Sequence, residues 1–232
     1  MSNTQPFQPA KALILDFGSV VTLTMFETHY LSERALGLRA GALDWMGPFD
    51  PSGDKLWAAM QREEITEREY WLTRTQQVGK LLGEEWTEMV NFVSRARGGN
   101  PMEIIRPEIA EIVKATVKAG KKLAILSNEL DLFYGAEFRV GLDFLAAFDV
   151  ISDGTYTGIL KPNPQAYTAC VTSLGLEPAD CVFIDDQMRN VTGGTKVGLH
   201  AIHLDVRNPR AAFNDAMSRL GIEKYFPENN SG

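Results

Sequence analysis

The stretch Leu13-Ile14-Leu15-Asp16-Phe17-Gly18-Ser19-Val20 places one carboxylate directly after a short aliphatic run. A continuous apolar run, without alternation of polar residues, is typical of a strand buried in a parallel sheet. We predict this first buried strand at residues 12–17, so Asp16 stands where the strand passes into a loop, and Gly18 follows two positions later. Because ligands of open parallel sheets bind at the carboxyl ends of the strands, this stretch predicts a parallel α/β fold with Asp16 at the functional edge.

Four more short aliphatic runs are closed by polar or turn residues and predict further buried strands, at 123–127, 149–152, 182–185 and 201–204. Amphipathic stretches lie between the runs, including 107–119 and 164–174. The second has Asn163 as its expected N-cap, Pro164 in its first turn and Gly175 at its end. Strands alternating with helices predict a Rossmann-like parallel sheet with helices on both faces.

Residues 22–100 interrupt this alternation. They contain no clear strand pattern, but they contain helical stretches at 54–61, 67–82 and 84–97 with aromatic residues at spacings suited to helix packing. The breaker cluster Gly98-Gly99-Asn100-Pro101 would return the chain to the sheet. We therefore expect an α/β core domain of residues 1–21 and 101–232, with a helical domain of residues 22–100 inserted after the first strand.

Composition narrows the class of protein. The 232 residues suit one domain with a large insertion, and the net charge of −7 disfavours nucleic acid or an anionic membrane as a partner. The first ten residues lack the basic start and apolar core of a signal peptide, and no apolar run reaches the length of a membrane span. We expect a cytoplasmic protein in which Cys170 and Cys181 are reduced core thiols.

Polar side chains follow other predicted strands. Ser127 and Asn128 end the second strand, and Asp185 and Asp186 end a later one. Lys161 lies in a rigid turn that opens a helix, at a place from which it can reach the same edge. Carboxylate oxygens suit Mg²⁺, while an ammonium and a hydroxyl suit phosphate oxygens. The sequence therefore predicts a site for Mg²⁺ and a phosphoryl group.

Taken in order, these residues resemble the four motifs of the haloacid dehalogenase superfamily. The motifs are Asp16-Phe17-Gly18-Ser19-Val20, Ser127 at a strand end, Lys161 before a helix, and Asp185-Asp186 followed by Asn190, Gly193 and Gly194. The resemblance covers almost the whole chain. It also implies that residues 22–100 form the family's helical cap, which closes over the substrate.

The resemblance further implies roles for individual residues. Asp16 would be the nucleophile and would form an aspartyl-phosphate that water hydrolyses. Mg²⁺ would be held by Asp16, the backbone carbonyl of Gly18 and Asp185, with Asp186 binding directly or through water.

The same resemblance implies the substrate contacts. Ser127, Asn128, Lys161 and the backbone at Gly18 would hold the phosphoryl group, which makes Asp16, Lys161 and Ser127 the expected catalytic residues. Asn190 is expected either to cap the following helix or to contact substrate. His29 is expected to be a solvated helix histidine. Candidate substrate contacts that could equally be core or surface residues are Trp45, Phe49 and Arg62.

Gly18 distinguishes this chain from most phosphatases of the family, which carry a second Asp there. Loss of a positioned general acid–base typically costs about 10²–10⁴-fold in rate. The Asp-x-Gly motif resembles sugar-phosphate phosphatases and the N-terminal phosphatase domain of soluble epoxide hydrolases.

Three functions therefore stay open. They are a Mg²⁺-dependent phosphatase, a 2-haloacid dehalogenase, and a non-catalytic binding protein that keeps the fold. The acidic pair Asp185-Asp186 disfavours the dehalogenase, and the retained charged residues disfavour the degenerate protein. We expect the phosphatase, acting on a small phosphorylated metabolite. The sequence does not identify that metabolite, and a homodimer is one possible assembly.

Overall fold

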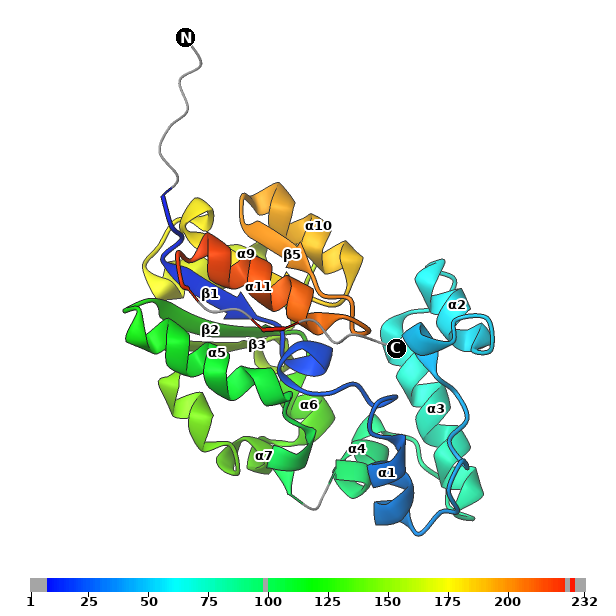
Figure 1. The fold of residues 1–232 in the computed structure, drawn as a ribbon. Coiled ribbons are helices and arrows are strands. Elements are labelled where there is room, and N and C mark those ends of the chain that lie inside the picture. The colour runs from blue at the N-terminus through cyan, green and yellow to red at the C-terminus, as the bar shows by residue number, and fades with distance from the viewer. Residues whose placement is uncertain (1–7, 98–99, 224–225, 228–232) are drawn as a thin grey trace. The chain divides into compact units, whose positions relative to one another are not determined.

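The computed structural model describes residues 8–97, 100–223 and 226–227. Its contacts divide the chain into two compact units (Figure 1). Unit 1 comprises Met1–Val21, Arg106–Asn128 and Phe144–Gly232, and unit 2 comprises Thr22–Ile105 and Glu129–Asp143. The segment 129–143, expected in the α/β domain, is thus grouped with unit 2. The roles of core and cap stay predictions. The expectations about a signal peptide and a domain boundary rest partly on residues 1–7 and 98–99, which lie outside the described residues.

Unit 1 is built on one parallel sheet. In the described part of the chain its strands are β1 (Ala12–Leu15), β2 (Lys122–Ser127), β3 (Val150–Asp153), β4 (Cys181–Asp185) and β5 (His200–His203). Their order is β3-β2-β1-β4-β5, so β1 lies in the middle, with Leu15 in register with Ile125 and Ile184. Every residue of β1 is buried, which explains its unbroken apolar run. The predicted Rossmann-like fold is confirmed.

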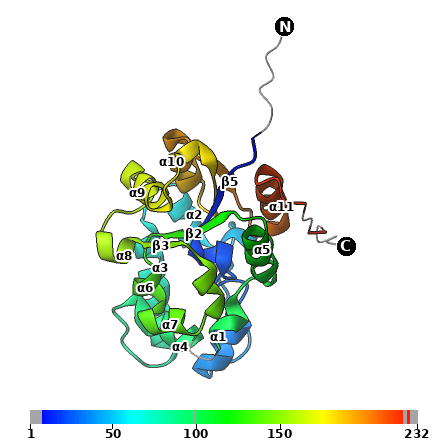
Figure 2. The same cartoon turned by 90° about the vertical axis from the view of Figure 1, so that its left-hand side faces the viewer.

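Helices cover both faces of this sheet (Figure 2). One face carries α5 (Pro107–Lys118) and α11 (Pro209–Arg219), and the other carries α9 (Pro164–Leu174) and α10 (Met188–Val197). The predicted signals for α9 are all present, because Asn163 accepts a hydrogen bond from the Gln165 amide and Gly175 ends the helix in a left-handed conformation. Gly194 lets α10 approach the sheet, since a Cβ there would lie 3.0 Å from the Phe183 ring.

Unit 2 is helical in its described residues. Its α-helices are α1 (His29–Leu36), α2 (Lys55–Gln61), α3 (Glu67–Leu81), α4 (Met89–Arg97), α6 (Leu130–Tyr134) and α7 (Ala136–Val140). Thr66 and Glu69 form a capping box that fixes the start of α3. The helix predicted for 84–97 begins only at Met89, because Trp86 turns back to pack against the bare face of Gly79, where a Cβ would lie 3.0 Å from the Trp86 ring.

Short elements connect these helices and strands. They are the tight turn Phe17–Val21, the 3₁₀ helices Gly47–Phe49, Pro101–Ile104, Asp143–Ala147 and Pro178–Asp180, and the single-turn α8 (Gly154–Thr157).

The core of unit 2 is aromatic. Phe26 packs edge-on against Trp45 at 5.7 Å and against Trp57 at 5.3 Å between ring centroids. Inside this core Asp54, 1% exposed, forms an ion pair with Arg74, whose guanidinium also lies over the Trp45 ring. Trp45 is therefore a core residue of unit 2.

Two sequence expectations concern environment rather than fold. Among the described residues, none of the helices has the length and apolar character needed to cross a membrane. Cys170 and Cys181 are both free and buried, and burial raises the pKa of each thiol to about 12. Neither thiol is thereby poised as a nucleophile at neutral pH.

Candidate active site

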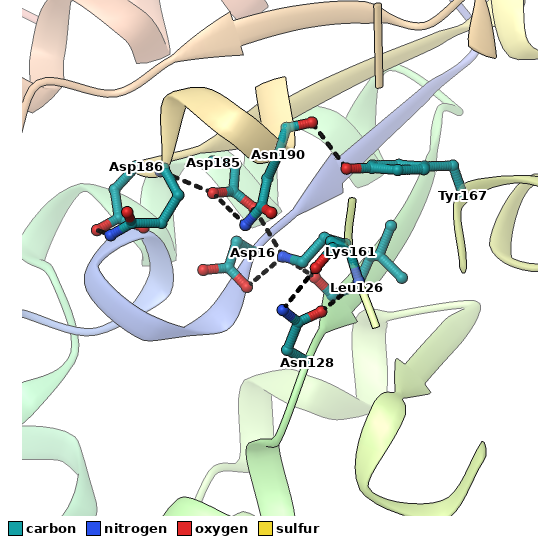
Figure 3. Close-up of polar contacts among 9 residues, drawn as sticks. Asp16, Leu126, Asn128, Lys161, Tyr167, Asp185, Asp186 and Asn190 are labelled. Atoms are coloured by element: carbon teal, nitrogen blue, oxygen red, sulfur yellow. Dashed lines mark hydrogen bonds and ion pairs between the residues drawn. The ribbon is translucent and has the colours of Figure 1, made fainter. Parts of the chain in front are cut away.

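Three adjacent strands deliver polar side chains to one edge of the unit 1 sheet (Figure 3). Asp16 follows β1, Ser127 ends β2 and Asp185 ends β4. Since β1 lies between β2 and β4, Asp16 is flanked on both sides, and its own amide donates to the Ile184 carbonyl at 2.9 Å. The topology of the sheet thus places residues that are more than 160 positions apart in the sequence at a common edge.

Lys161 connects these strand ends. Its Nζ donates to Asp16 Oδ1, to Asp185 Oδ2 and to the Leu126 carbonyl, each at 2.7 Å, so all three ammonium hydrogens are used. The side chain is 1% exposed. Burial on its own lowers the pKa of Lys161, but the charges and hydrogen bonds of Asp16 and Asp185 overcome that effect and raise the pKa above its ordinary value. Lys161 is therefore a buried, permanently charged cation.

Asp16 has an unusual electrostatic environment. Burial raises the pKa of Asp16 to about 7, with Lys161 opposing the rise and the negative charge of Asp185 adding to it. Its side chain retains 13% exposure, while that of Asp185 has none. Asp16 is thus the carboxylate of this pair that solvent can reach, with one oxygen held by Lys161.

Asp185 is held from several directions. Its Oδ1 accepts from the Gln187 amide at 2.8 Å, and the Asn190 side-chain amide donates to both carboxylate oxygens, at 3.0 and 3.1 Å. The Tyr167 hydroxyl of α9 donates to the Asn190 carbonyl at 2.8 Å. Asn190 is therefore not the cap of α10, which is Gln187, but a side chain that orients Asp185. Its spacing of five residues after Asp185 is the only sequence signal for this contact.

The carboxylates of this edge fit a divalent cation. Asp16, Asp185 and Asp186 each offer an oxygen, and the three oxygens lie within 4.8 Å of one another. Mg²⁺ favours such hard oxygen donors. The Lys161 ammonium balances one of the three negative charges when all are ionised, so a divalent cation would neutralise the rest. Asp16, Asp185 and Asp186 could hold such an ion.

The turn after Asp16 reverses the usual placement of glycine. Gly18 has φ −65° and ψ 135°, a conformation open to any residue, whereas Ser19 has φ 63° in the left-handed region. A Cβ built on Gly18 meets no atom within 4 Å. The buried Arg106 holds this turn, because its Nε donates to the Ser19 carbonyl at 2.9 Å. Neither backbone nor packing requires glycine at position 18.

Asn128 and Ser127 lie beside Lys161. Ser127 is buried at the end of β2, as expected. The Asn128 side chain binds the backbone of Lys161 through both its oxygen and its nitrogen. No sequence signal points to this contact, because its partner is a main chain 33 positions away. The predicted contact of Asn128 with substrate stays a prediction.

Two other sequence expectations concern residues of unit 2. His29 is 7% exposed in unit 2, so the expectation of a solvated histidine is wrong. Its Nε2 donates to the Trp45 carbonyl at 2.6 Å, a contact that fixes the ring in the core. Arg62 is exposed and pairs with Glu64.

Comparison with known proteins gives a family for this arrangement. Residues 10–198 match the family model described as haloacid dehalogenase-like hydrolase. The CbbY protein of Cupriavidus necator is 33% identical over 109 residues, which are 45% of this chain and 41% of that protein. The phosphoglycolate phosphatase of Psychrobacter arcticus is 26% identical over 168 residues, 66% of this chain and 71% of that protein.

A solved structure supports the same fold. The HAD-hydrolase YfnB of Bacillus subtilis, bound to magnesium, superposes with a TM-score of 0.63 at 16% identity and covers 85% of this chain and 87% of that chain. The match spans less than half the length of several curated relatives, 10%, 41% and 28% in three of them.

Proposed function

Because the chain belongs to the haloacid dehalogenase-like hydrolases, we propose that it is a Mg²⁺-dependent phosphatase that acts on a small phosphorylated metabolite. The observation that carries the proposal is the buried Lys161 ammonium, which binds both Asp16 and Asp185 while Asp186 lies within 4.8 Å of both carboxylates. A relative named as a phosphoglycolate phosphatase supports phosphoryl chemistry. The two free thiols support a reducing compartment such as the cytoplasm.

Asp16 is the nucleophile in this proposal. Lys161 holds Oδ1, so Oδ2 attacks phosphorus, the ester P–O bond breaks, and an aspartyl-phosphate forms. Water then attacks the phosphorus, releases inorganic phosphate and regenerates the Asp16 carboxylate. Lys161 offsets the repulsion between the carboxylate and the anionic substrate throughout. Bound Mg²⁺, held by Asp16, Asp185, Asp186 and the Gly18 carbonyl, would supply further positive charge to the phosphoryl oxygens.

Gly18 sets a condition on the leaving group. No side chain at this position can protonate the departing oxygen, so the proton comes from water or from a group elsewhere. The favoured substrates are those whose leaving group needs little protonation, such as anomeric or acyl phosphates. Esters of poorly acidic alcohols should be hydrolysed slowly.

The test is phosphate release from a panel of sugar, acyl and aryl phosphates, with Mg²⁺ and with chelator. We expect turnover with Mg²⁺, none with chelator, and the highest rates for anomeric or acyl phosphates. Activity that survives chelation would remove the metal from the proposal. Chloride release from 2-chloropropionate would favour a dehalogenase, and Mg²⁺ binding without turnover of any phosphate would favour a binding protein.

A further inference from the structure

We propose that Asn128 is a positioning residue that acts through Lys161, rather than a ligand of the substrate. Asn128 Oδ1 accepts a hydrogen bond from the Lys161 amide at 2.6 Å, and Asn128 Nδ2 donates to the Lys161 carbonyl at 3.1 Å (Figure 3). The side-chain amide of Asn128 therefore forms hydrogen bonds with the peptide groups on both sides of the Lys161 Cα atom. The inference rests on the proposed function, because it concerns the residue that neutralises the nucleophile and the phosphoryl group.

The end of β2 holds Lys161 at two points. Asn128 fixes the backbone from which the side chain begins, and the Leu126 carbonyl accepts from Nζ at the tip, 2.7 Å away. A lysine side chain has four rotatable bonds, so a fixed base and a fixed tip together remove most of its freedom. The ammonium is thereby held where it meets Asp16 and Asp185.

Asn128 is itself held by the end of β3. The backbone of Gly154 lies so close that a Cβ there would be 2.4 Å from the Asn128 carbonyl oxygen and 2.6 Å from Leu160 Cδ2. Asp153, the residue before it, pairs in register with Ser127 and caps the turn with an oxygen that accepts from the Thr155 amide. The sheet therefore fixes Asn128, and Asn128 fixes Lys161.

The chain provides a matched control for this contact. On α11, Asn214 Nδ2 donates to the Phe226 carbonyl at 2.9 Å, and Asn214 Oδ1 accepts from the Phe226 amide at 2.8 Å. Both asparagines are half-buried, and each forms two hydrogen bonds with the backbone of one residue that is distant in the sequence. Asn214 binds none of the described residues at the carboxyl ends of the strands. The variant Asn214→Ala therefore measures the structural cost of losing two such hydrogen bonds.

The experiment compares Asn128→Ala, Asn214→Ala and Lys161→Ala in the full chain with Mg²⁺, using the fastest ester of the phosphate panel. We expect Asn128→Ala to lower kcat by about 10²-fold, the scale of effect of a small displacement in an active site. Asn214→Ala should keep the wild-type kcat. In the Lys161→Ala background, Asn128→Ala should add no further loss, because its effect passes through Lys161.

Two more measurements separate positioning from substrate contact. A residue that acts on the phosphoryl group through Lys161 should lower kcat by the same factor for every ester in the panel, whereas a contact to the leaving group should depend on that group. Asn128→Asp keeps the acceptor for the Lys161 amide and loses the donor to the Lys161 carbonyl. We expect this variant to fold and to lose less activity than Asn128→Ala.

Several results would overturn the inference. They are a loss that adds to that of Lys161→Ala, a loss confined to KM for particular esters, or an equal loss in Asn214→Ala. If the wild-type protein hydrolyses no phosphate, the proposed function fails, and a crystal structure of Asn128→Ala decides the inference separately. A Lys161 Nζ displaced from Asp16 supports it, and an unmoved Lys161 overturns it.

Discussion

Each unit of this protein buries a cluster of charged side chains, and the two clusters differ in net charge. In unit 2 a single carboxylate, Asp54, meets the guanidinium of Arg74. Each Asp54 oxygen accepts two hydrogen bonds, from the Gly47 and Trp57 amides, the Tyr70 hydroxyl and Arg74. The one negative charge of Asp54 is thus balanced by the one positive charge of Arg74, and both carboxylate oxygens have their donors. In unit 1 the ammonium of Lys161 faces a group of three carboxylates, and burial raises the pKa of Asp16 to about 7.

The difference teaches how to distinguish a structural from a functional buried charge. A buried network with no net charge stabilises the fold in which it lies, because removing one charged member leaves the other buried and unpaired. A network with surplus charge costs stability, and such a cost persists where it serves binding or catalysis. By this criterion the Asp54 cluster maintains unit 2, and the Lys161 cluster is the candidate for binding or catalysis.

The largest expected effect comes from removing the surplus charge in unit 1. Asp16→Asn should abolish turnover, a loss on the order of 10⁴-fold or more, as for other covalent nucleophiles. The raised pKa means that the charged form of Asp16 is disfavoured in the folded state. The variant should therefore be at least as stable as the wild type at pH 8 in chelator, measured by denaturant unfolding. Asp215→Asn on α11 is the control, and wild-type turnover by Asp16→Asn would remove the nucleophile.

Breaking the balanced pair in unit 2 should have the opposite consequence. Asp54→Ala leaves Arg74 buried without its partner, which should lower the free energy of unfolding by about 3–5 kcal/mol. Asp50→Ala, at an exposed carboxylate four residues earlier that accepts from the Ser52 hydroxyl and the Gly53 amide, is the control and should lower the free energy of unfolding by only about 1 kcal/mol. Equal stability of the two variants would contradict the structural role of Asp54.

Adding a carboxylate to unit 1 tests what its cluster lacks. Gly18→Asp meets no steric barrier, since no atom lies within 4 Å of a Cβ at this position. If general acid catalysis is missing, hydrolysis of alkyl phosphates should rise by about 10²-fold and that of 4-nitrophenyl phosphate much less. Gly18→Asn fills similar space without a titratable group and should give no such rise. An equal response of both ester types to Gly18→Asp would mean that the proton already comes from elsewhere.

The smallest expected effect is on the free energy of unfolding and comes from His29, a buried, uncharged side chain of unit 2. Burial lowers the pKa of His29 below 6.5, although the Trp45 carbonyl opposes this. As pH falls through 6.5, the unfolded chain takes up a proton and the folded chain does not, so the free energy of unfolding should fall. One such group contributes at most about 1.4 kcal/mol per pH unit. His29→Gln should lack this component, and superimposable pH profiles of stability would refute the assignment.

Much of the fold could be predicted from local sequence signals. The five strands lie within two residues of their predicted ends, because buried parallel strands leave unbroken apolar runs. Helix α9 begins and ends where predicted, because cap, proline and glycine all act locally. The start predicted at Glu84 is wrong, since Trp86 packs against Gly79 and a contact between side chain and backbone overrides helix propensity there.

The candidate site was only partly predictable for a related reason. The topology of a parallel sheet brings strand ends to one edge, so the meeting of Asp16, Ser127 and Asp185 follows from their positions in the sequence. The hydrogen bonds between Asn128 and Lys161 join a side chain to a backbone. Because any residue has the same backbone groups, such a contact leaves no pattern in the sequence. The burial of His29 depends likewise on the Trp45 carbonyl, whose position only the fold defines.

The turn after Asp16 finally bears on how the sequence of this chain could change. Ser19 occupies a left-handed conformation that glycine adopts more easily, while Gly18 occupies one that any residue adopts. The fold thus imposes no stereochemical demand for glycine at position 18, where an added Cβ would meet no atom within 4 Å. An aspartate could therefore replace Gly18 without a change in the path of the backbone, so a second carboxylate in this turn is open to a single substitution.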